Sequence, residues 1–400
     1  MIFNKLIELT KKGIIMKKNI RLAFVLKNTV LFFIATICLL SSCTQSKNDS
    51  VPVVAIKSES LQQKVITSLS KNVILSTYTN LSDSASALHQ QVLILEKNKT
   101  QQNLNLAQDA WKKSRLYWES TESFIFGPVE SLSIDPLIDT WPLNITDLKS
   151  IINSPAPITS SVIRTIGTNL KGFHTIEFIL FGDGVQTNQK LITSLTDREI
   201  EYLKATTEVL AEDTAKLTYA WTTQADPDDV TSLPYISIIM NPTENKIYGS
   251  EQAVIIQLIN SMIGIADEVA NGKIAGPLGD SLASADPTAE ESPFSWNSTT
   301  DFANNIKSIR LLFLGAQGNN QGENLGLKSL LDQKNPSLSS DVVNQIDLAI
   351  QKIQDIAGPE GTPFGQAILD AQKRDRVVSA QVEVSKLFIL LDQKVLPVFQ

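Results

Sequence analysis

The stretch Gly172-Phe-His174-Thr-Ile-Glu177-Phe-Ile-Leu-Phe-Gly182 places two ionisable side chains in an otherwise apolar run that ends at a glycine. Its apolar residues would cover every side of a helix, and a helix that is apolar all round is buried. His174 and Glu177 are three positions apart, so on a helix they lie on one face and can reach the same object. A buried glutamate is costly unless it has a partner. The stretch therefore predicts a buried helix on which Glu177 pairs with a metal, a ligand or a structural cation.

The sequence on both sides of this stretch also has helical patterning. Apolar residues recur every three or four positions in several long segments, a spacing that indicates amphipathic helices. The clearest of these segments are residues 81–95, 197–221, 254–265, 341–356 and 377–398. Strand-like alternation is scarce, with residues 233–236 as a weak exception. We predict an all-α fold of two packed helical bundles, an N-terminal bundle over residues 59–230 and a C-terminal bundle over residues 240–400.

The first 43 residues have the pattern of an export signal. Basic residues are followed by an apolar stretch at residues 30–40, which is shorter than the roughly 20 residues of a membrane-spanning helix. Leu40-Ser-Ser-Cys43 then resembles a bacterial lipobox, although an ordinary signal peptide or an uncleaved anchor would share much of this pattern. We predict a lipoprotein signal peptide over residues 1–42, and a lipidated Cys43 that begins a flexible tether over residues 43–58. After Cys43 we expect no segment of membrane-spanning length.

Removal of this leader would change the charge of the chain. Residues 1–42 hold seven basic residues and one acidic residue, which leaves 28 basic and 41 acidic residues and a net charge of −13. Such a charge argues against nucleic acid as a partner and fits a bacterial cell-envelope protein that faces the periplasm or the cell exterior. The two cysteines, Cys38 and Cys43, both lie at or before the lipidation point. Any metal site in the mature protein must therefore use histidine, carboxylates and other oxygen ligands.

Three segments share one plan, in which a charged residue precedes a mainly apolar run and a glycine follows five positions later. They are Glu122 to Gly127, Glu177 to Gly182 and Arg310 to Gly315. Each glycine is predicted to end a helix, because glycine accepts the positive φ that helix C-caps often need. Arg310 then either belongs to a functional cluster or neutralises one of the glutamates in a structural salt bridge.

Polar residues around Glu122 extend this candidate site. Arg115, Glu119 and Glu122 fall at i, i+4 and i+7, which places them on one helical face, and Asp139 follows in the next segment. Arg115 is also a candidate structural partner of Glu177, as is Arg164.

A loop before the Arg310 segment supplies further polar candidates. Ser298 and Asp301 have the spacing of a capping box and are predicted to start a helix. Ser295 and Asn297 have no helical role, so we predict that they make polar contacts in a cleft, although loop residues of these types also form turns.

Three motifs in order resemble the imelysin family. They are Trp111…Arg115…Glu122…Phe126-Gly-Pro128, Gly172-x-His174-x-x-Glu177 and Ser292-x-Phe294-Ser295-x-Asn297. The resemblance extends over most of the chain after residue 60. It implies a two-domain helical fold with a site near the domain interface, and a role in periplasmic acquisition of metal, chiefly iron. By the same resemblance, His174 and Glu177 are the site pair, and Glu122 and Ser295 are secondary members.

The family also includes a proposed insulin-cleaving metallopeptidase, and the residues of this chain give that activity little support. Helical metallopeptidases of the His-Glu-x-x-His type use two histidines one turn apart. The other histidine of this chain, His89, lies on an ordinary amphipathic segment and receives no role. One imidazole with two or three carboxylates suits iron, manganese or calcium better than zinc.

We therefore predict a lipid-anchored binding protein that holds a divalent or trivalent metal, foremost iron, or a small metal-bearing ligand between two helical domains. A metal-dependent peptidase using the His-x-x-Glu pair is the alternative, and a purely structural charge cluster is the third hypothesis. The membrane, reached through the lipid anchor, and other iron-uptake components are the expected partners. No catalytic residue is assigned. The predicted metal ligands are His174, Glu177 and Glu122, and the predicted ligand-binding residues are Ser295, Asn297, Arg310, Asp139 and Arg115.

Overall fold

Helices make up the regular structure of this chain. The computed structural model describes residues 59–316 and 324–400, and over these residues it contains α, 3-10 and π helices and no strand. The all-α prediction is confirmed. The predicted signal peptide, the tether and Cys43 lie outside the described residues.

Ten α-helices occupy the part of the described chain before residue 245. They are α2 (Leu61–Ser68), α3 (Ser76–Lys97), α4 (Gln101–Glu119), α5 (Pro128–Ser131), α6 (Ile134–Ile138), α7 (Ile145–Asn153), α8 (Ser160–Thr165), α9 (Gly172–Phe181), α10 (Asp197–Thr222) and α11 (Tyr235–Met240). The alternation at residues 233–236 thus leads into a short helix, α11, and not into a strand.

Eight α-helices follow in the remainder of the described chain. They are α12 (Glu251–Asp267), α13 (Ala275–Leu278), α14 (Ser298–Leu314), α15 (Leu327–Lys334), α16 (Pro336–Asp355), α17 (Phe364–Ile368), α18 (Arg374–Leu390) and α19 (Leu396–Phe399). Between α12 and α13 the helix widens into a π-helical turn, Glu268–Ile274. A π-helical turn bonds i to i+5 and is frequent at functional sites.

Polar side chains at the helix starts explain several of these boundaries. Thr196 caps α10, where its side chain accepts from the backbone N–H of Glu199 and the Glu199 carboxylate accepts from the backbone of Thr196. This reciprocal capping box satisfies two backbone donors that a helix start would leave free. Thr100 and Ser250 cap α4 and α12 in the simpler one-sided way.

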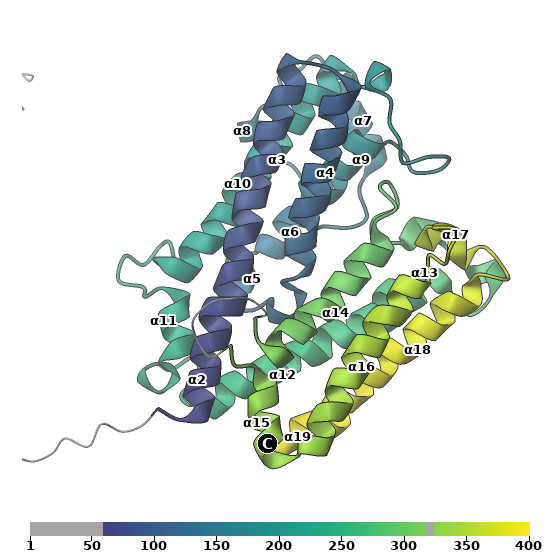
Figure 1. Ribbon diagram of the computed structural model, residues 1–400. Helices are drawn as coiled ribbons and strands as arrows, with labels where there is room; N and C mark the ends of the chain where they lie inside the picture. Colours follow the sequence, from purple (N-terminus) through teal and green to yellow (C-terminus); the bar gives the residue numbers. More distant parts are fainter. Residues whose placement is uncertain (1–58, 317–323) are drawn as a thin grey trace, which may run out of the picture. The chain divides into compact units, whose positions relative to one another are not determined.

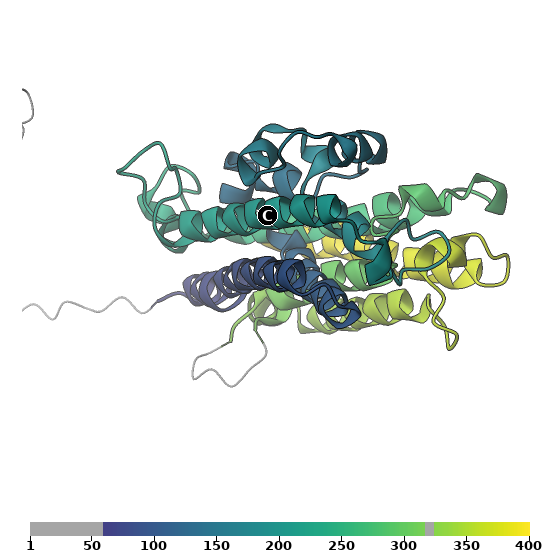
Figure 2. The same cartoon turned by 90° about the horizontal axis from the view of Figure 1, so that it is seen from above.

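The helices pack in two groups that touch along α12 and α14. In the first group, α3 lies between α4 and α10, and α9 lies against both α4 and α10 (Figure 1). In the second group, α16 packs between α14 and α18, and α12 lies against α14 and α18. A view turned by 90° again shows α3 and α10 side by side (Figure 2).

Contacts between the groups place the candidate site. Helix α14 also packs on α4, and the 3-10 turn Glu122–Phe124 lies against both α12 and α14. Residues 59–400 consequently form a single compact unit. The division into bundles at residues 59–230 and 240–400 stays a prediction.

One described helical run is long and apolar enough to cross a membrane, which differs from the expectation that none after Cys43 would be. This run, Glu251–Leu278, has 28 residues. It comprises α12, the π-helical turn and α13, and half of its apolar window is buried inside the protein. Its packing against α14 and α18 is that of a core helix.

Candidate functional site

Helix α9 carries the His-x-x-Glu pair and is buried along its whole length. All ten of its residues are buried, as the apolar pattern predicted. It begins at Gly172, where φ is +77° and an added Cβ would lie 2.2 Å from the carbonyl oxygen of Ile138. Only glycine permits that approach, because it has no Cβ and accepts a positive φ. The close contact brings α9 against the end of α6, which is followed directly by Asp139.

Both ring nitrogens of His174 lie close to carboxylate oxygens. Its Nε2 lies 3.1 Å from Asp139 Oδ1, and its Nδ1 lies 3.4 Å from Glu177 Oε2. Burial lowers the pKa of His174, but the hydrogen bonds to Asp139 and Glu177 outweigh it and raise the pKa to about 9. At neutral pH the ring is an imidazolium that donates two hydrogen bonds. His174 would have to release a carboxylate and a proton before it could bind a metal.

Glu177 finds its partners on the loop before α14. Its Oε1 accepts from the backbone N–H of Ser295 at 2.8 Å and from Ser295 Oγ at 2.7 Å. Neither Arg164 nor Arg310 reaches it, because these arginines pair with Glu212 and Asp347 respectively. The partner that a buried Glu177 required is thus a serine together with a histidine.

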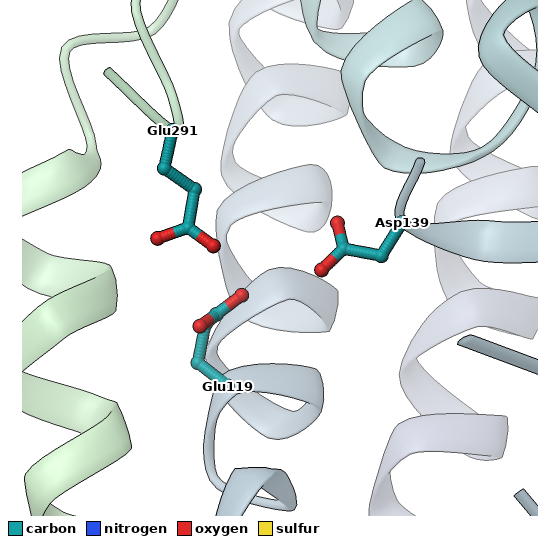
Figure 3. A group of neighbouring side chains, drawn as sticks. All are labelled: Glu119, Asp139 and Glu291. Atoms are coloured by element: carbon teal, nitrogen blue, oxygen red, sulfur yellow. The ribbon is translucent and has the colours of Figure 1, made fainter. Parts of the chain in front are cut away.

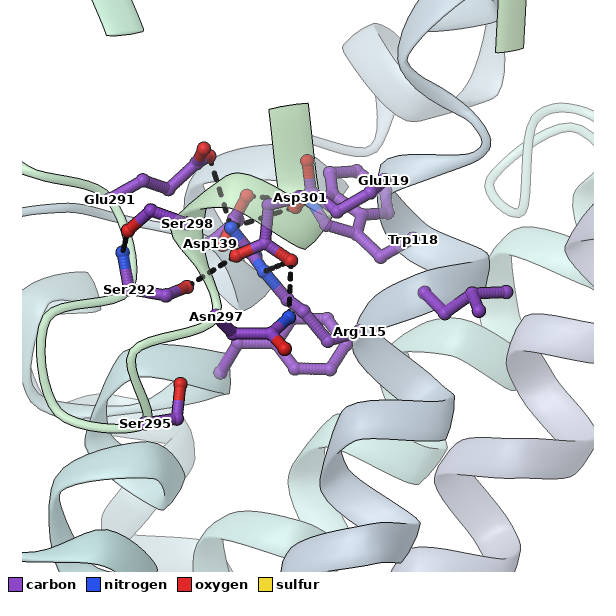
Figure 4. Close-up of polar contacts among 12 residues, drawn as sticks. Arg115, Trp118, Glu119, Asp139, Glu291, Ser292, Ser295, Asn297, Ser298 and Asp301 are labelled. Atoms are coloured by element: carbon purple, nitrogen blue, oxygen red, sulfur yellow. Dashed lines mark hydrogen bonds and ion pairs between the residues drawn. The ribbon is translucent and has the colours of Figure 1, made fainter. Parts of the chain in front are cut away.

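Arg115 is the centre of the charge cluster (Figure 4). Its side chain is 0% exposed, and its Nη2 lies 2.7 Å from Glu119 Oε1 and 3.0 Å from Glu291 Oε1. Nη1 donates to Asp139 Oδ1, and Nε lies 3.9 Å from Asp301 Oδ1. Burial lowers the pKa of Arg115, but the surrounding carboxylates outweigh it and raise the pKa well above its usual value. Arg115 was predicted to bind a ligand. In the structure it neutralises buried carboxylates inside the protein.

Asp139 joins Arg115 to His174. It also accepts a hydrogen bond at 2.6 Å from Trp118 Nε1 through its Oδ2. Burial alone would raise the pKa of Asp139, but Arg115 and His174 hold it well below its usual range. Asp139 is therefore ionised at neutral pH.

The loop residues predicted to face a cleft support buried carboxylates instead. Asn297 Nδ2 donates to Asp301 Oδ1 at 2.7 Å, and Ser292 Oγ donates to Asp301 Oδ2 at 2.6 Å. Both Ser295 and Asn297 are buried. They act on the site through the carboxylates of Glu177 and Asp301.

The helix predicted to start at Ser298 is observed as α14, but the predicted capping box is not formed. Asn297 is the N-cap residue and makes no side-chain cap, whereas Asp301 faces the charge cluster. Ser298 Oγ donates to Glu290 Oε2 at 3.0 Å and accepts from the backbone N–H of Ser292. Burial, partly offset by Arg115, raises the pKa of Asp301 to about 7. The polar side chains of this loop are thus engaged in the cluster and not in helix initiation.

Lys273 supplies the second cation of the cluster. It lies on the π-helical turn, and its Nζ is 2.8 Å from Glu291 Oε1 and 3.2 Å from Asn305 Oδ1. The carboxylates of Glu119, Glu268 and Glu122 lie 3.7, 3.8 and 4.0 Å from the same nitrogen. Lys273 was not among the predicted site residues, because nothing in its local sequence distinguishes it from a surface lysine.

A cavity of about 600 Å³ opens beside Lys273. Its ionisable lining residues are Glu122, Asp135, Asp139, His174, Glu268, Lys273 and Glu291. Of the three predicted metal ligands, Glu122 and His174 line this cavity and Glu177 does not. Arg310 does not line the cavity and is 2.8 Å from Asp347 on α16, which corrects its predicted place in the cluster.

The helix-end plan holds for two of its three segments. Gly182 and Gly315 end α9 and α14 with φ of +92° and +84°. Gly127 has φ of +63° but precedes α5, because Glu122 begins a 3-10 turn and not an α-helix. Glu122 thus reaches the cavity from a tight turn, and burial, partly offset by Lys273, raises its pKa well above the usual value.

Three carboxylates have the geometry to hold a metal ion (Figure 3). One oxygen each from Glu119, Asp139 and Glu291 lies within 4.8 Å of the other two. Glu291 Oε2 is buried and has no hydrogen-bond partner, although the Glu291 side chain lines the cavity. A set of oxygen ligands fits hard cations such as calcium, manganese and iron. Of these three residues, Asp139 was among the predicted site residues, and Glu119 was considered as a further carboxylate ligand, whereas Glu291 was not assigned to the site.

This fold and site define an all-α protein in which a buried ion-pair cluster forms one wall of an acidic cavity. The sequence model of the imelysin family matches residues 74–391, so the chain belongs to the imelysin family. The chain is 26% identical over 329 residues to iron-regulated protein A of Synechococcus elongatus, covering 82% of this chain and 84% of the relative.

Two solved structures are similar to this protein. One is described as an iron-regulated protein A precursor from Parabacteroides distasonis, with a TM-score of 0.73, 28% identity, and coverage of 85% of this chain and 95% of the other. The second is an imelysin-like protein from Psychrobacter arcticum, with a TM-score of 0.65, 14% identity, and coverage of 84% and 95%. The second likeness concerns the fold alone. The predictions of an imelysin-like fold and family are confirmed.

Proposed function

We propose that this protein is an envelope protein that binds a hard metal cation, foremost iron, or a small ligand carrying such a cation, in the acidic cavity. The observation that carries this proposal is the convergence of Glu119, Asp139 and Glu291, together with the unpartnered Oε2 of Glu291. A buried carboxylate oxygen without a hydrogen-bond donor is costly, and a cation would satisfy it.

The proposed ligand set differs from the predicted one. Glu119, Asp139 and Glu291 would hold the cation. Asp139 and Glu291 line the cavity together with Glu122, whereas Glu119 is fully buried. His174 and Glu177 orient this set from behind, since His174 fixes Asp139 and Glu177 fixes His174. The alternative of a metal-dependent peptidase has less support, because the imidazole of His174 is already held by two carboxylates.

The relatives support the choice of iron and of the envelope. Both the cyanobacterial relative and the Parabacteroides protein are named iron-regulated. The second is called a precursor, which fits our proposal that residues 1–42 are removed and that Cys43 carries a lipid anchor. Incorporation of labelled palmitate in a bacterial host tests the anchor, and loss of label in Cys43→Ala is the expected result.

Metal binding is tested with the purified mature protein. We expect bound metal by elemental analysis, and binding of added Fe³⁺, Mn²⁺ or Ca²⁺ by titration calorimetry. Asp139→Asn and Glu291→Gln should each weaken affinity roughly tenfold or more, since even outer-shell partners of a metal contribute about 10- to 100-fold. Asp347→Asn is the matched control, because Asp347 also pairs with an arginine but lies away from the cavity. Absence of any metal binding by the wild type would refute the proposal.

A further inference from the structure

The ammonium group of Lys273 lies among oxygen atoms in the way that a bound cation would. Glu291 Oε1 and Asn305 Oδ1 accept hydrogen bonds from it, at 2.8 and 3.2 Å. Three more carboxylates, from Glu119, Glu122 and Glu268, lie within 4.0 Å of Nζ. Five oxygen-bearing side chains around one positive nitrogen are a set that a hard metal ion would also accept.

This oxygen set overlaps the proposed metal ligands. Glu119 and Glu291 belong to both, and Glu291 offers Oε1 to Lys273 while its buried Oε2 has no hydrogen-bond partner. A cation bound by Glu119 and Glu291 would therefore lie within a few ångströms of the lysine ammonium. Two like charges at that separation repel each other strongly in a partly buried site. A metal ion and the lysine ammonium group therefore cannot bind these carboxylates at the same time.

Of the two cations in the cluster, Lys273 is the one that can leave. Arg115 is 0% exposed and is held by carboxylates on several sides, whereas the Lys273 side chain is 12% exposed and lines the cavity. A lysine has a flexible four-carbon stem and a compact charge that needs no fixed fork geometry. It can thus rotate from the carboxylates toward the solvent of the cavity.

We propose that Lys273 is a tethered counter-ion of Glu119 and Glu291, and that a metal ion binds to these two carboxylates by displacing its ammonium group. This inference rests on the proposed function, because it concerns how the same cavity is filled and emptied. The lysine would neutralise the carboxylates while no metal is bound and would lower the affinity for metal, so that a bound ion can be released.

Substitution of Lys273 tests the proposal directly. We expect Lys273→Met to bind Mn²⁺ or Ca²⁺ at least about tenfold more tightly than the wild type, because close charge pairs commonly couple by that much or more. Lys190→Met is the matched control. Lys190 is 10% exposed, pairs with Glu199 at 2.9 Å and lies away from the cavity. The Lys190→Met substitution should leave the metal affinity unchanged.

The metal affinities of the wild type and of Lys273→Met together show whether one or both of the proposals are wrong. If the wild type binds metal and Lys273→Met binds it equally or more weakly, the counter-ion proposal is wrong and the proposed function stands. If Lys273→Met binds metal while the wild type does not, metal does not displace the lysine in the native protein, and both proposals are wrong. If neither protein binds metal, both proposals fail.

A second measurement uses only the wild type, so it is informative even if the variant fails to fold. Acetylation of lysines by an amine-reactive ester, followed by mass spectrometry, should label Lys273 faster when Mn²⁺ or Ca²⁺ is added, and Lys190 at an unchanged rate. Unchanged or slower labelling of Lys273 under metal-saturated conditions would overturn the proposal.

Discussion

The charge cluster has two halves, each with one cationic side chain among carboxylates, that differ in their access to solvent. In the sealed half, Arg115 and Asp301 are both 0% exposed and are surrounded by protein on every side. In the open half, Lys273 and Glu122 are 12% and 7% exposed and face the cavity. Glu119 and Glu291 contact both cations, whereas Asp139 contacts Arg115 and lines the cavity. We infer that burial divides the cluster into a permanent ion-pair network and an exchangeable one.

Removal of the central arginine should have the largest effect. Arg115→Met leaves several carboxylates buried without their cation, and breaking a buried pair in this way costs about 3–5 kcal/mol. We expect a matching loss in the free energy of unfolding, measured in urea. Arg164→Met is the control, because Arg164 pairs with Glu212 on the surface and its loss should scarcely move the urea midpoint. A nearly unchanged midpoint for Arg115→Met would abolish the distinction between the halves.

The imidazolium at the boundary of the halves should make stability depend on alkaline pH. The pKa of His174 is about 9 in the folded protein and about 6.5 for a free histidine. The native state then binds more protons, so the stabilisation is fully present below pH 6.5 and is lost as the pH rises through 9. The total is on the order of 3 kcal/mol.

His174→Gln should therefore remove part of the decline in stability between pH 7 and 10, measured by urea denaturation at each pH. His89→Gln is the control, because burial lowers the pKa of His89 and places its titration below pH 6.5. Identical slopes for wild type and His174→Gln would show that the ring is neutral in the folded protein.

The serine that holds Glu177 should have a smaller effect. Ser295→Ala removes the 2.7 Å hydrogen bond from Oγ and keeps the backbone N–H donor at 2.8 Å. We expect a loss of about 1–2 kcal/mol, as for a single hydrogen bond to a charged group. Ser340→Ala, at an exposed serine of α16, should change stability little. Equal effects for the two variants would mean that Ser295 does not support the cluster.

The smallest effect is expected outside both halves. Arg310 pairs with Asp347, and the two side chains are 32% and 52% exposed. Arg310→Met should lose less than about 1 kcal/mol, the usual contribution of an exposed pair. Metal affinity, measured by calorimetry on the same sample, should not change. A marked loss of metal affinity would show that Arg310 belongs to the site, contrary to its position in the structure.

Local patterning predicted the helices and one side of the site. The apolar run around His174 and Glu177 requires a buried helix, and α9 is buried throughout. Arg115 and Glu119 are one turn apart on α4, and their ion pair follows from that spacing. Such features depend on residues within a few positions of each other.

The other side of the site depends on tertiary packing that no local pattern records. Glu291 meets Arg115 across 176 positions of sequence, and Asn305 meets Glu119 across 186. Asp301 has the spacing of a helix cap, so its local sequence indicated a common role that the packing of α14 on α4 overrides. Arg310 was misplaced for the opposite reason, since a shared sequence plan does not imply a shared location.

The π-helical turn Glu268–Ile274 has a consequence for how this site can vary among relatives. A π turn holds one more residue than an α turn, so it can arise or disappear by a single insertion or deletion. Loss of one residue between Glu268 and Lys273 would rotate the lysine by roughly 100° about the helix axis, away from the carboxylates. A one-residue gap at this point in an alignment would then mark homologues that lack the built-in cation, even where the lysine itself is retained.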